Sequence, residues 1–282
     1  MRLIVTGGGT GGHVFPALEV ARLARDRKVD VAYFGSIRGQ EAQACKNANI
    51  PFAGFASEPI YSVKSLKGLR ALWRMAQARR TALGALKSAK ADVVFGTGGY
   101  SAAPVISAAK ALKIPYVLHE QNSAPGRTIS LMAKDAYAVA TTFESAAERF
   151  AGCNVVRTGL PVRRELREAA QRKGPSLVPL VLVVGGSQGA QAVNEAALGA
   201  AKRMVNRPIH WSHVAGRAHF EDVFLSYEKL GLKDNYQVHA FLDVDQMATA
   251  YSESSIVVGR SGAATLSELA AFRLPSITCP YP

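Results

Sequence analysis

The chain has 282 residues, 48% of them hydrophobic, with 34 Lys and Arg against 21 Asp and Glu, a formal net charge of +13. The length suits two domains of about 140 residues each. The apolar runs are too short for a membrane-spanning helix, which needs ~18 residues, and the three scattered cysteines lack disulfide or metal-site spacing. The basic balance favours an anionic partner, such as nucleic acid, anionic lipid or a phosphorylated substrate.

Strand and helix patterns alternate along the whole chain. Apolar, β-branched runs predict strands at residues 3–6, 29–34, 92–95, 115–118, 155–158, 178–184, 209–214, 255–258 and 276–279. Helical patterns lie between them, for example at residues 16–27, 102–112, 190–204 and 264–272, with Pro16 expected in a first turn. This alternation predicts an α/β fold with parallel sheets and helices on both faces.

A charged stretch punctuated by Gly and Pro separates two halves of the chain, and a new strand–glycine-loop–helix unit follows it. We therefore expect two Rossmann-like domains, residues 1–160 and 161–282, with a ligand cleft between them. The second half has fewer strand–helix units than the first and stops directly after a strand. The sequence is accordingly expected to be incomplete at its C-terminus.

Four glycine-rich turns follow strands and open helices, at residues 7–12, 96–99, 185–189 and 259–262. Glycine lets backbone approach a ligand, and a helix N-terminus offers free N–H groups and partial positive charge. Together the turns predict a site for a nucleotide-linked, anionic substrate. The first turn fits the dinucleotide fingerprint, but residues 32–36 supply no acid at the end of the second strand, which disfavours a nicotinamide cofactor.

Several polar residues sit where such loops would hold a ligand. His13 follows the first loop and suits a base or a hydrogen-bond donor, or else a backbone-bonded histidine at a helix start. The polar run at residues 119–122, which follows a buried strand, is typical of a ligand-binding row. Arg163 is either a residue that binds a phosphate or an ordinary charge in a linker. Ser187 suits a hydrogen-bond donor to a phosphate. Glu268 either binds the ribose of a nucleotide or is a solvated residue of its helix.

Asp243 and Asp245 form a D-x-D pair, a pattern that chelates divalent ions in some glycosyltransferases. Here Asp245 is interpreted instead as the N-cap of a helix. We predict no metal site in this chain.

Between Pro59 and Asp92 the chain has many basic residues and no acidic one. The basic residues alternate with aliphatic residues and Trp73 at helical spacing. This pattern predicts a basic amphipathic helix, which either lies on an anionic membrane or packs with a solvated basic face. A nucleic-acid partner is disfavoured because the stretch lacks a platform of stacking aromatics.

The ordered motifs resemble those of the MurG family of bacterial N-acetylglucosaminyltransferases. The resemblance begins with the sequence GGGTGGHVFPAL at residues 7–18 and spans the chain. It continues with GTGGY, HEQN, GLPVR, GGSQGA and RSGA…SE, at residues 96–100, 119–122, 159–163, 185–190 and 260–268. The family's later Gln-rich sugar-contacting turn and last helix have no counterpart here.

The resemblance implies a GT-B fold and inverting, metal-independent transfer of GlcNAc from UDP-GlcNAc to lipid I, giving lipid II for peptidoglycan, without a cofactor. It implies that Glu268 contacts the ribose of UDP-GlcNAc and that the backbone of Leu242 contacts the uracil. The full set of residues implied to contact this donor is Thr10, Gly11, Gly12, His13, Asn122, Arg163, Ser187, Gln188, Leu242, Ala263 and Glu268. The acceptor diphosphate would lie on Gly9, Gly11, Gly98, Gly99 and Tyr100.

The same resemblance makes His13 the candidate catalytic base. It also implies a peripheral position on the anionic cytoplasmic face of the bacterial inner membrane, contacted through Lys67, Arg70, Trp73 and Arg74. Two alternatives stay open: another GT-B glycosyltransferase with a lipid acceptor, and a non-catalytic fragment that binds UDP-sugar.

Overall fold

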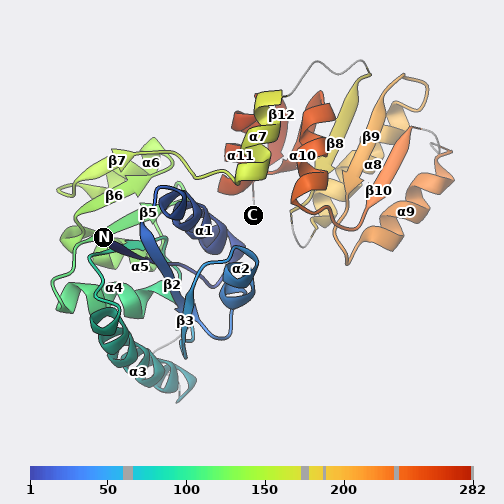
Figure 1. The fold of residues 1–282 in the computed structure, drawn as a ribbon. Helices are drawn as coiled ribbons and strands as arrows, with labels where there is room; N and C mark the ends of the chain where they lie inside the picture. Colours follow the sequence, from blue (N-terminus) through green and yellow to red (C-terminus); the bar gives the residue numbers. More distant parts are fainter. Residues whose placement is uncertain (60–65, 173–177, 187–188, 232–234, 281–282) are drawn as a thin grey trace. The chain divides into compact units, whose positions relative to one another are not determined.

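The computed structural model describes residues 1–59, 66–172, 178–186, 189–231 and 235–280. The chain divides into two compact units, Met1–Pro161 and Val162–Pro282 (Figure 1). Both units are built on wholly parallel sheets with helices on either side. The α/β class expected from the sequence is therefore confirmed.

The first unit contains, in its described part, a seven-stranded sheet of order β3-β2-β1-β4-β5-β6-β7. Its strands are β1 (Arg2–Thr6), β2 (Asp30–Ser36), β3 (Phe52–Phe55), β4 (Val93–Gly96), β5 (Tyr116–Glu120), β6 (Ala138–Thr141) and β7 (Val155–Arg157). Its helical elements are α1 (Gly11–Asp26), α2 (Glu41–Asn47), α3 (Leu66–Ser88), α4 (Ala102–Ala111), α5 (Arg127–Met132), η1 (Ala133–Asp135), α6 (Glu144–Ala147) and η2 (Glu148–Phe150).

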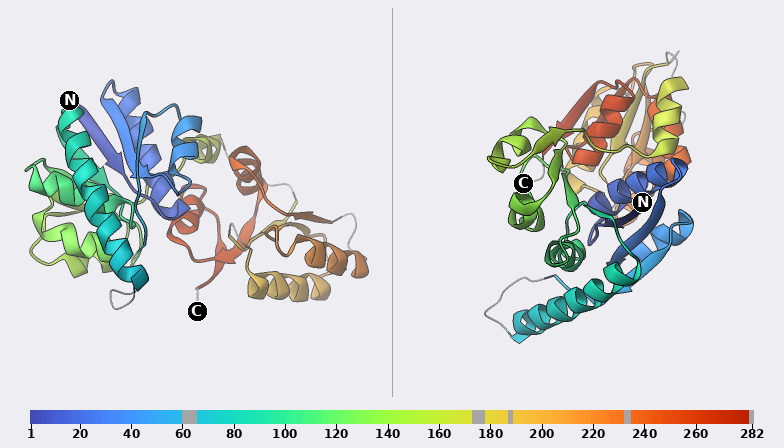
Figure 2. Two further views of the ribbon diagram at one scale, coloured as in Figure 1. Left: turned by 90° about the horizontal axis from the view of Figure 1, so that it is seen from below. Right: turned by 60° about the vertical axis from the view of Figure 1, so that its left-hand side comes forward.

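The two faces of this sheet are covered by different helices because successive side chains of a strand point in opposite directions. On β1, Leu3 and Val5 join a core with Leu18 of α1, whereas Ile4 joins a core with Ile106 of α4. The long helix α3 packs against α4 and β3 along the second face, as the teal helix in Figure 2 shows. Its buried core residues are Ala78, Ala82 and Leu86.

The second unit contains, among its described residues, a five-stranded sheet of order β10-β9-β8-β11-β12. The strands are β8 (Leu180–Val184), β9 (His210–Val214), β10 (Tyr236–His239), β11 (Ile256–Arg260) and β12 (Ser276–Cys279). The helices are α7 (Arg164–Arg172), α8 (Gln191–Arg203), α9 (Phe220–Lys229), α10 (Val244–Glu253) and α11 (Ala263–Ala271). One core contains residues of α8 and α9 and the other contains residues of α7, α10 and α11, so helices cover both faces.

Three strands, β3, β6 and β10, were not expected from the sequence. Their sequences, FAGF, AVAT and YQVH, are four residues long and contain small or polar residues in place of a β-branched run. Two of them, β3 and β10, are edge strands of their sheets. Pairing with a neighbouring strand, rather than intrinsic propensity, makes these segments strands.

Two predictions about helix starts are wrong. Pro16 lies well inside α1, not in its first turn, because the helix already begins at Gly11 after the extended residue Thr10. Asp243, not Asp245, is the N-cap of α10. Its carboxylate accepts hydrogen bonds from the backbone N of Asp245 at 3.0 Å and of Gln246 at 2.9 Å. Because the Gln246 side chain accepts in return from the backbone N of Asp243, the two residues form a capping box.

A buried hydrogen-bond network joins α8 to strands β9 and β10 of the second sheet. The Asn194 side-chain amide donates to the Ala215 carbonyl at 3.1 Å, so its oxygen, 2.9 Å from Nε2 of His213, must accept from that ring. Nδ1 of His213 then accepts from the Tyr236 hydroxyl, 2.7 Å away. Burial lowers the pKa of His213 to about 4, which keeps the ring neutral in this network.

This network predicts acid sensitivity. An unfolded histidine has a pKa of about 6.5, so below that pH the unfolded state takes up a proton that folded His213 resists. Stability should fall by about 3 kcal/mol as the pH drops from roughly 6.5 to 4. Urea denaturation across this range should show a flatter pH dependence for His213→Gln. The control His210→Gln, exposed on the same strand, should keep the wild-type slope; an unchanged slope in both variants would contradict the assignment.

Candidate functional site

Three adjacent strands of the first unit, β1, β4 and β5, end beside one another, and their loops form one cluster. Successive strands are added to one side of β1 as far as β3 and to the other side from β4 onwards. Such a switch in strand order, here between β1 and β4, is where α/β folds commonly bind ligands. The Gly8 backbone N donates to the Gly98 carbonyl at 3.3 Å, and the Thr97 hydroxyl donates to the His13 carbonyl at 2.8 Å. Residues far apart in the sequence thus form a single loop cluster.

The glycines of this cluster are required by backbone packing. Gly99 has φ +80°, and a Cβ placed on it would lie 1.9 Å from the Gly8 carbonyl oxygen. The Gly9 N–H is already bonded to the buried Glu41 carboxylate at 3.2 Å. Backbone N–H groups for an anion are therefore expected from the start of α1, at Gly11 and Gly12, where Thr10 makes no side-chain cap.

His13 lies in the first turn of α1 and is half-buried at the centre of the cluster. Its Nδ1 atom is 2.9 Å from the Thr97 carbonyl oxygen and 2.9 Å from Oε1 of Gln121. Gln121 was not singled out from the sequence as a partner of His13, because the two are joined only by the meeting of α1 and the loop after β5. The structure brings His13 together with the predicted loop of Gly98 and Gly99, whose Cβ positions face its ring.

The polar run at residues 119–122 begins inside β5, whose last two residues are His119 and Glu120. Three of its four residues, His119, Glu120 and Gln121, are buried. The Glu120 carboxylate accepts from the backbone N of Asn122 at 2.8 Å and of Gly126 at 2.8 Å, so it stabilises the loop itself. Asn122 is exposed and remains the one member of the run that is open to solvent.

The second unit repeats the arrangement of strand, glycine loop and helix at β8 and α8. A Cβ on Gly189, which has φ +80°, would lie 2.4 Å from the Ala215 carbonyl oxygen, so this loop packs tightly against the end of β9. Ser187 and Gln188, predicted to bind the donor, lie outside the described residues. Helix α8 follows with Ala190 as an N-cap that makes no side-chain hydrogen bond.

Glu268 on α11 accepts from two side chains of the same unit. Arg163 Nη2 lies 3.0 Å from its Oε1, and the Tyr251 hydroxyl donates to its Oε2 at 3.2 Å. Burial and the nearby carboxylate raise the pKa of Tyr251, which keeps the phenol protonated as a donor. The structure thus joins two predicted residues, Arg163 and Glu268, and adds Tyr251, which the sequence did not indicate. Ala263 is the first residue of the same helix.

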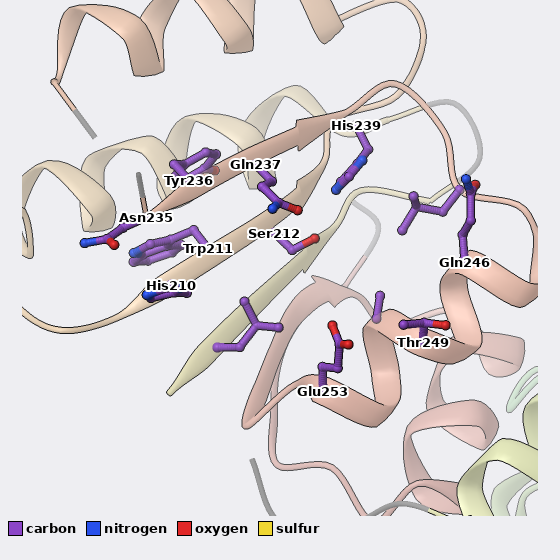
Figure 3. A pocket seen from close by; sticks show the side chains of 13 residues that line it. His210, Trp211, Ser212, Asn235, Tyr236, Gln237, His239, Gln246, Thr249 and Glu253 are labelled. Carbon is purple, nitrogen blue, oxygen red and sulfur yellow. The ribbon is translucent and has the colours of Figure 1, made fainter. Parts of the chain in front are cut away.

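A cavity of about 390 Å³ lies in the second unit, between α10 and the face formed by β8, β9 and β10 (Figure 3). Ser212, Gln237, His239, Gln246 and Glu253 supply much of its polar lining. Of the predicted donor residues that the structure describes, Leu242 alone lines it.

The outer side of α3 carries the residues predicted to meet a membrane. Leu69, Leu72 and Trp73 have exposed fractions of 57%, 40% and 61%, and Arg70 is exposed beside them. Arg74 is half-buried and forms an ion pair with Glu58. The side chain of Lys67 lies outside the described part of the structure. Within the described segments, no helix combines the length and apolar character needed to cross a bilayer.

Comparison with known proteins agrees with this architecture. Residues 3–141 match the glycosyltransferase family 28 N-terminal domain, and residues 180–282 match the C-terminal domain of the same family. The crystal structure of Acinetobacter baumannii MurG is 30% identical with a TM-score of 0.80, over 100% of this chain and 79% of that one. A Rickettsia africae glycosyltransferase, 14% identical with a TM-score of 0.68, shares the fold over 98% of this chain and 78% of its own.

Two curated relatives carry the same name, UDP-N-acetylglucosamine–N-acetylmuramyl-(pentapeptide) pyrophosphoryl-undecaprenol N-acetylglucosamine transferase. The protein from Desulforamulus reducens is 37% identical and that from Listeria monocytogenes 36% identical. Each match covers 100% of this chain and 79% of the relative. The family resemblance found in the motifs is thereby confirmed. The chain belongs to glycosyltransferase family 28, as a member of the MurG group of N-acetylglucosaminyltransferases with a GT-B fold.

Proposed function

We propose that this chain transfers GlcNAc from UDP-GlcNAc to the muramoyl C4 hydroxyl of lipid I, giving lipid II for peptidoglycan synthesis. The observation that carries the proposal is His13, held at 2.9 Å from both Thr97 and Gln121 within a cluster of glycine loops. The printed names of the relatives, which match over the full length of this chain, support the choice of donor and acceptor.

The second unit is proposed to hold the nucleotide. Glu268, with both carboxylate oxygens already oriented by Arg163 and Tyr251, suits the two ribose hydroxyls. The N-terminus of α8, together with Ser187 and Gln188, suits the diphosphate. The turn between β10 and α10 at Leu242 presents backbone to the uracil. Thr10, Asn122 and Ala263, which the resemblance to the family indicates, complete the proposed contacts with UDP-GlcNAc.

The proposed reaction is a direct, inverting displacement that needs no metal. The acceptor oxygen attacks the anomeric carbon, the bond from that carbon to the diphosphate oxygen breaks, and UDP leaves with the electron pair. His13 takes the proton of the acceptor hydroxyl as general base. Helix N-termini and loop N–H groups stabilise the charge that develops on the leaving diphosphate. Gly11, Gly98, Gly99 and Tyr100 are proposed to hold the diphosphate of the acceptor, with Gly9 lining the same loop while its N–H stays on Glu41.

The exposed side of α3 is proposed to lie on the anionic cytoplasmic face of the inner membrane, where a lipid-linked acceptor resides. Apolar Leu69, Leu72 and Trp73 stand next to basic Arg70, the combination that holds an interfacial helix on anionic lipid. Exposed apolar side chains of this size on a helix are otherwise costly in solubility, which supports a contact surface.

The transfer is tested with labelled UDP-GlcNAc and lipid I in detergent. Wild type should form lipid II, and His13→Gln should lower kcat by about 10²–10⁴-fold, the usual contribution of a general base. UDP-GlcNAc should still raise the thermal stability of the variant, and NAD should not. Donor binding without any transfer by wild type would favour the non-catalytic alternative, and transfer to diacylglycerol instead of lipid I would favour another lipid glycosyltransferase.

The ribose role of Glu268 is tested with UDP and 2′-deoxy-UDP in calorimetric titrations. Wild type should prefer UDP by about tenfold or more, since a hydrogen bond to a charged group contributes about 1.5–3 kcal/mol. Glu268→Gln should lose most of this preference, and Tyr251→Phe part of it. The control is Glu253→Gln, which alters the cavity of Figure 3 instead. Loss of preference in Glu253→Gln alone would move the ribose to that cavity.

Membrane binding is tested by sedimentation with phosphatidylglycerol or phosphatidylcholine vesicles. Arg70→Glu should weaken binding to the anionic vesicles by roughly ten- to thirtyfold, because the attraction of a basic residue near the surface, ~1 kcal/mol, is lost and the new carboxylate is repelled by a similar amount. Trp73→Ser should weaken it through lost apolar contact. Arg203→Glu makes the same charge change at an exposed position on α8 and should have little effect. Equal losses for both arginines would mean that net charge, not the α3 surface, is responsible.

A further inference from the structure

A chain of hydrogen bonds runs through the first unit from the backbone at Gly159 to the ring of His13. His119 Nε2 is 2.9 Å from the Gly159 carbonyl oxygen, and His119 Nδ1 is 3.1 Å from Nε2 of Gln121. Gln121 Oε1 is 2.9 Å from His13 Nδ1. His119 and Gln121 are buried, with 2% and 3% of their surface exposed, so water does not compete for these bonds.

Backbone carbonyls fix the direction of every bond in this chain, because a carbonyl oxygen can only accept. The Gly159 carbonyl requires a proton on His119 Nε2. Burial lowers the pKa of His119, so the ring is neutral and its Nδ1 is an acceptor. The Gln121 side-chain nitrogen also lies 2.8 Å from the His119 carbonyl oxygen, which sets the amide with its NH₂ group toward His119.

The amide oxygen of Gln121 must then face His13. Two acceptors, this oxygen and the Thr97 carbonyl, lie 2.9 Å from the same ring nitrogen of His13. Nδ1 of His13 therefore carries the proton, and Nε2 is left with a free lone pair. A ring held by a single acceptor keeps some freedom of orientation, whereas two acceptors on one nitrogen restrict both its tautomer and its direction.

We propose that Gln121 is a positioning residue that holds His13 in the Nδ1–H tautomer and so presents Nε2 as the proton acceptor. This inference rests on the proposed role of His13 as the base. Gln121 needs no contact with substrate for this role. The carbonyl groups of Gly159 and His119 fix the direction of the hydrogen bonds, and Gln121 thereby turns its amide oxygen toward the ring of His13. Outer partners that orient histidines at metal sites contribute ten- to hundredfold to affinity or activity, and a comparable effect on kcat is expected here.

The tautomer is read directly by two-bond ¹H–¹⁵N NMR of protein labelled on histidine nitrogen, with the His13 signals assigned from His13→Gln. Wild type should show His13 as the Nδ1–H form. Gln121→Met keeps the side-chain size but removes one of the two acceptors, and the Thr97 carbonyl alone holds the ring less firmly. The Nδ1–H form should therefore lose population, and kcat should fall about ten- to hundredfold, with little change in the KM for UDP-GlcNAc. Gln121→Glu, as a buried neutral acid, can donate its O–H to His119 and keep its carbonyl oxygen toward His13, so it should recover the Nδ1–H form and part of kcat.

The matched control is Gln43→Met, which makes the same substitution at an exposed position on α2, bonded to Asn47; its tautomer and kcat should equal those of wild type. The Nε2–H form in wild type would overturn the inference, as would unchanged kcat and tautomer in Gln121→Met. If Gln121→Met does not fold, the wild-type tautomer and the Gln121→Glu variant decide. Failure of the proposed function is distinct: wild type would show the Nδ1–H form yet transfer no sugar.

Discussion

The contact between two backbone segments, the loop after β1 and the loop after β4, is the constraint on which the first unit's site depends. The Gly8 carbonyl and the Cα of Gly99 are so close that no side chain fits between them. Their approach brings the Thr97 carbonyl to the ring of His13. Because a β-carbon at Gly99 would push the loops apart, the glycines fix the position of an imidazole that lies elsewhere in the sequence.

Buried polar side chains support both units in the same way: they form hydrogen bonds with backbone groups of the protein itself. Glu120 holds the loop after β5, and Glu41 holds Gly9. Asn194 and His213 join α8 to its sheet next to the second glycine loop. Each of these groups would cost free energy if left unpaired in the interior. Rigid loops are the result, and the proposed site, which would orient a diphosphate and a base, requires rigid loops.

The sequence predicted the features that depend on residue type at one place in the chain. Glycine after a strand marked the loops around Gly8 and Gly99, and helical spacing marked α3. It did not predict the partners that depend on folding, such as Gln121 for His13 or Tyr251 for Glu268, since these come from separate elements. Nor did it show which side of α3 packs: the buried residues of that helix are largely alanines, which let it approach α4 closely, whereas Leu69 and Leu72 are exposed.

The chain has two tryptophans, and each unit contains one of them. Trp73 stands exposed on α3, whereas Trp211 on β9 is buried and stacks on Tyr236, with ring centroids 6.1 Å apart. Their surroundings differ in polarity, so their fluorescence emission differs in wavelength and in access to soluble quenchers. The protein thus carries a separate optical probe in each unit, one sensitive to the surface of α3 and the other to the integrity of the second core.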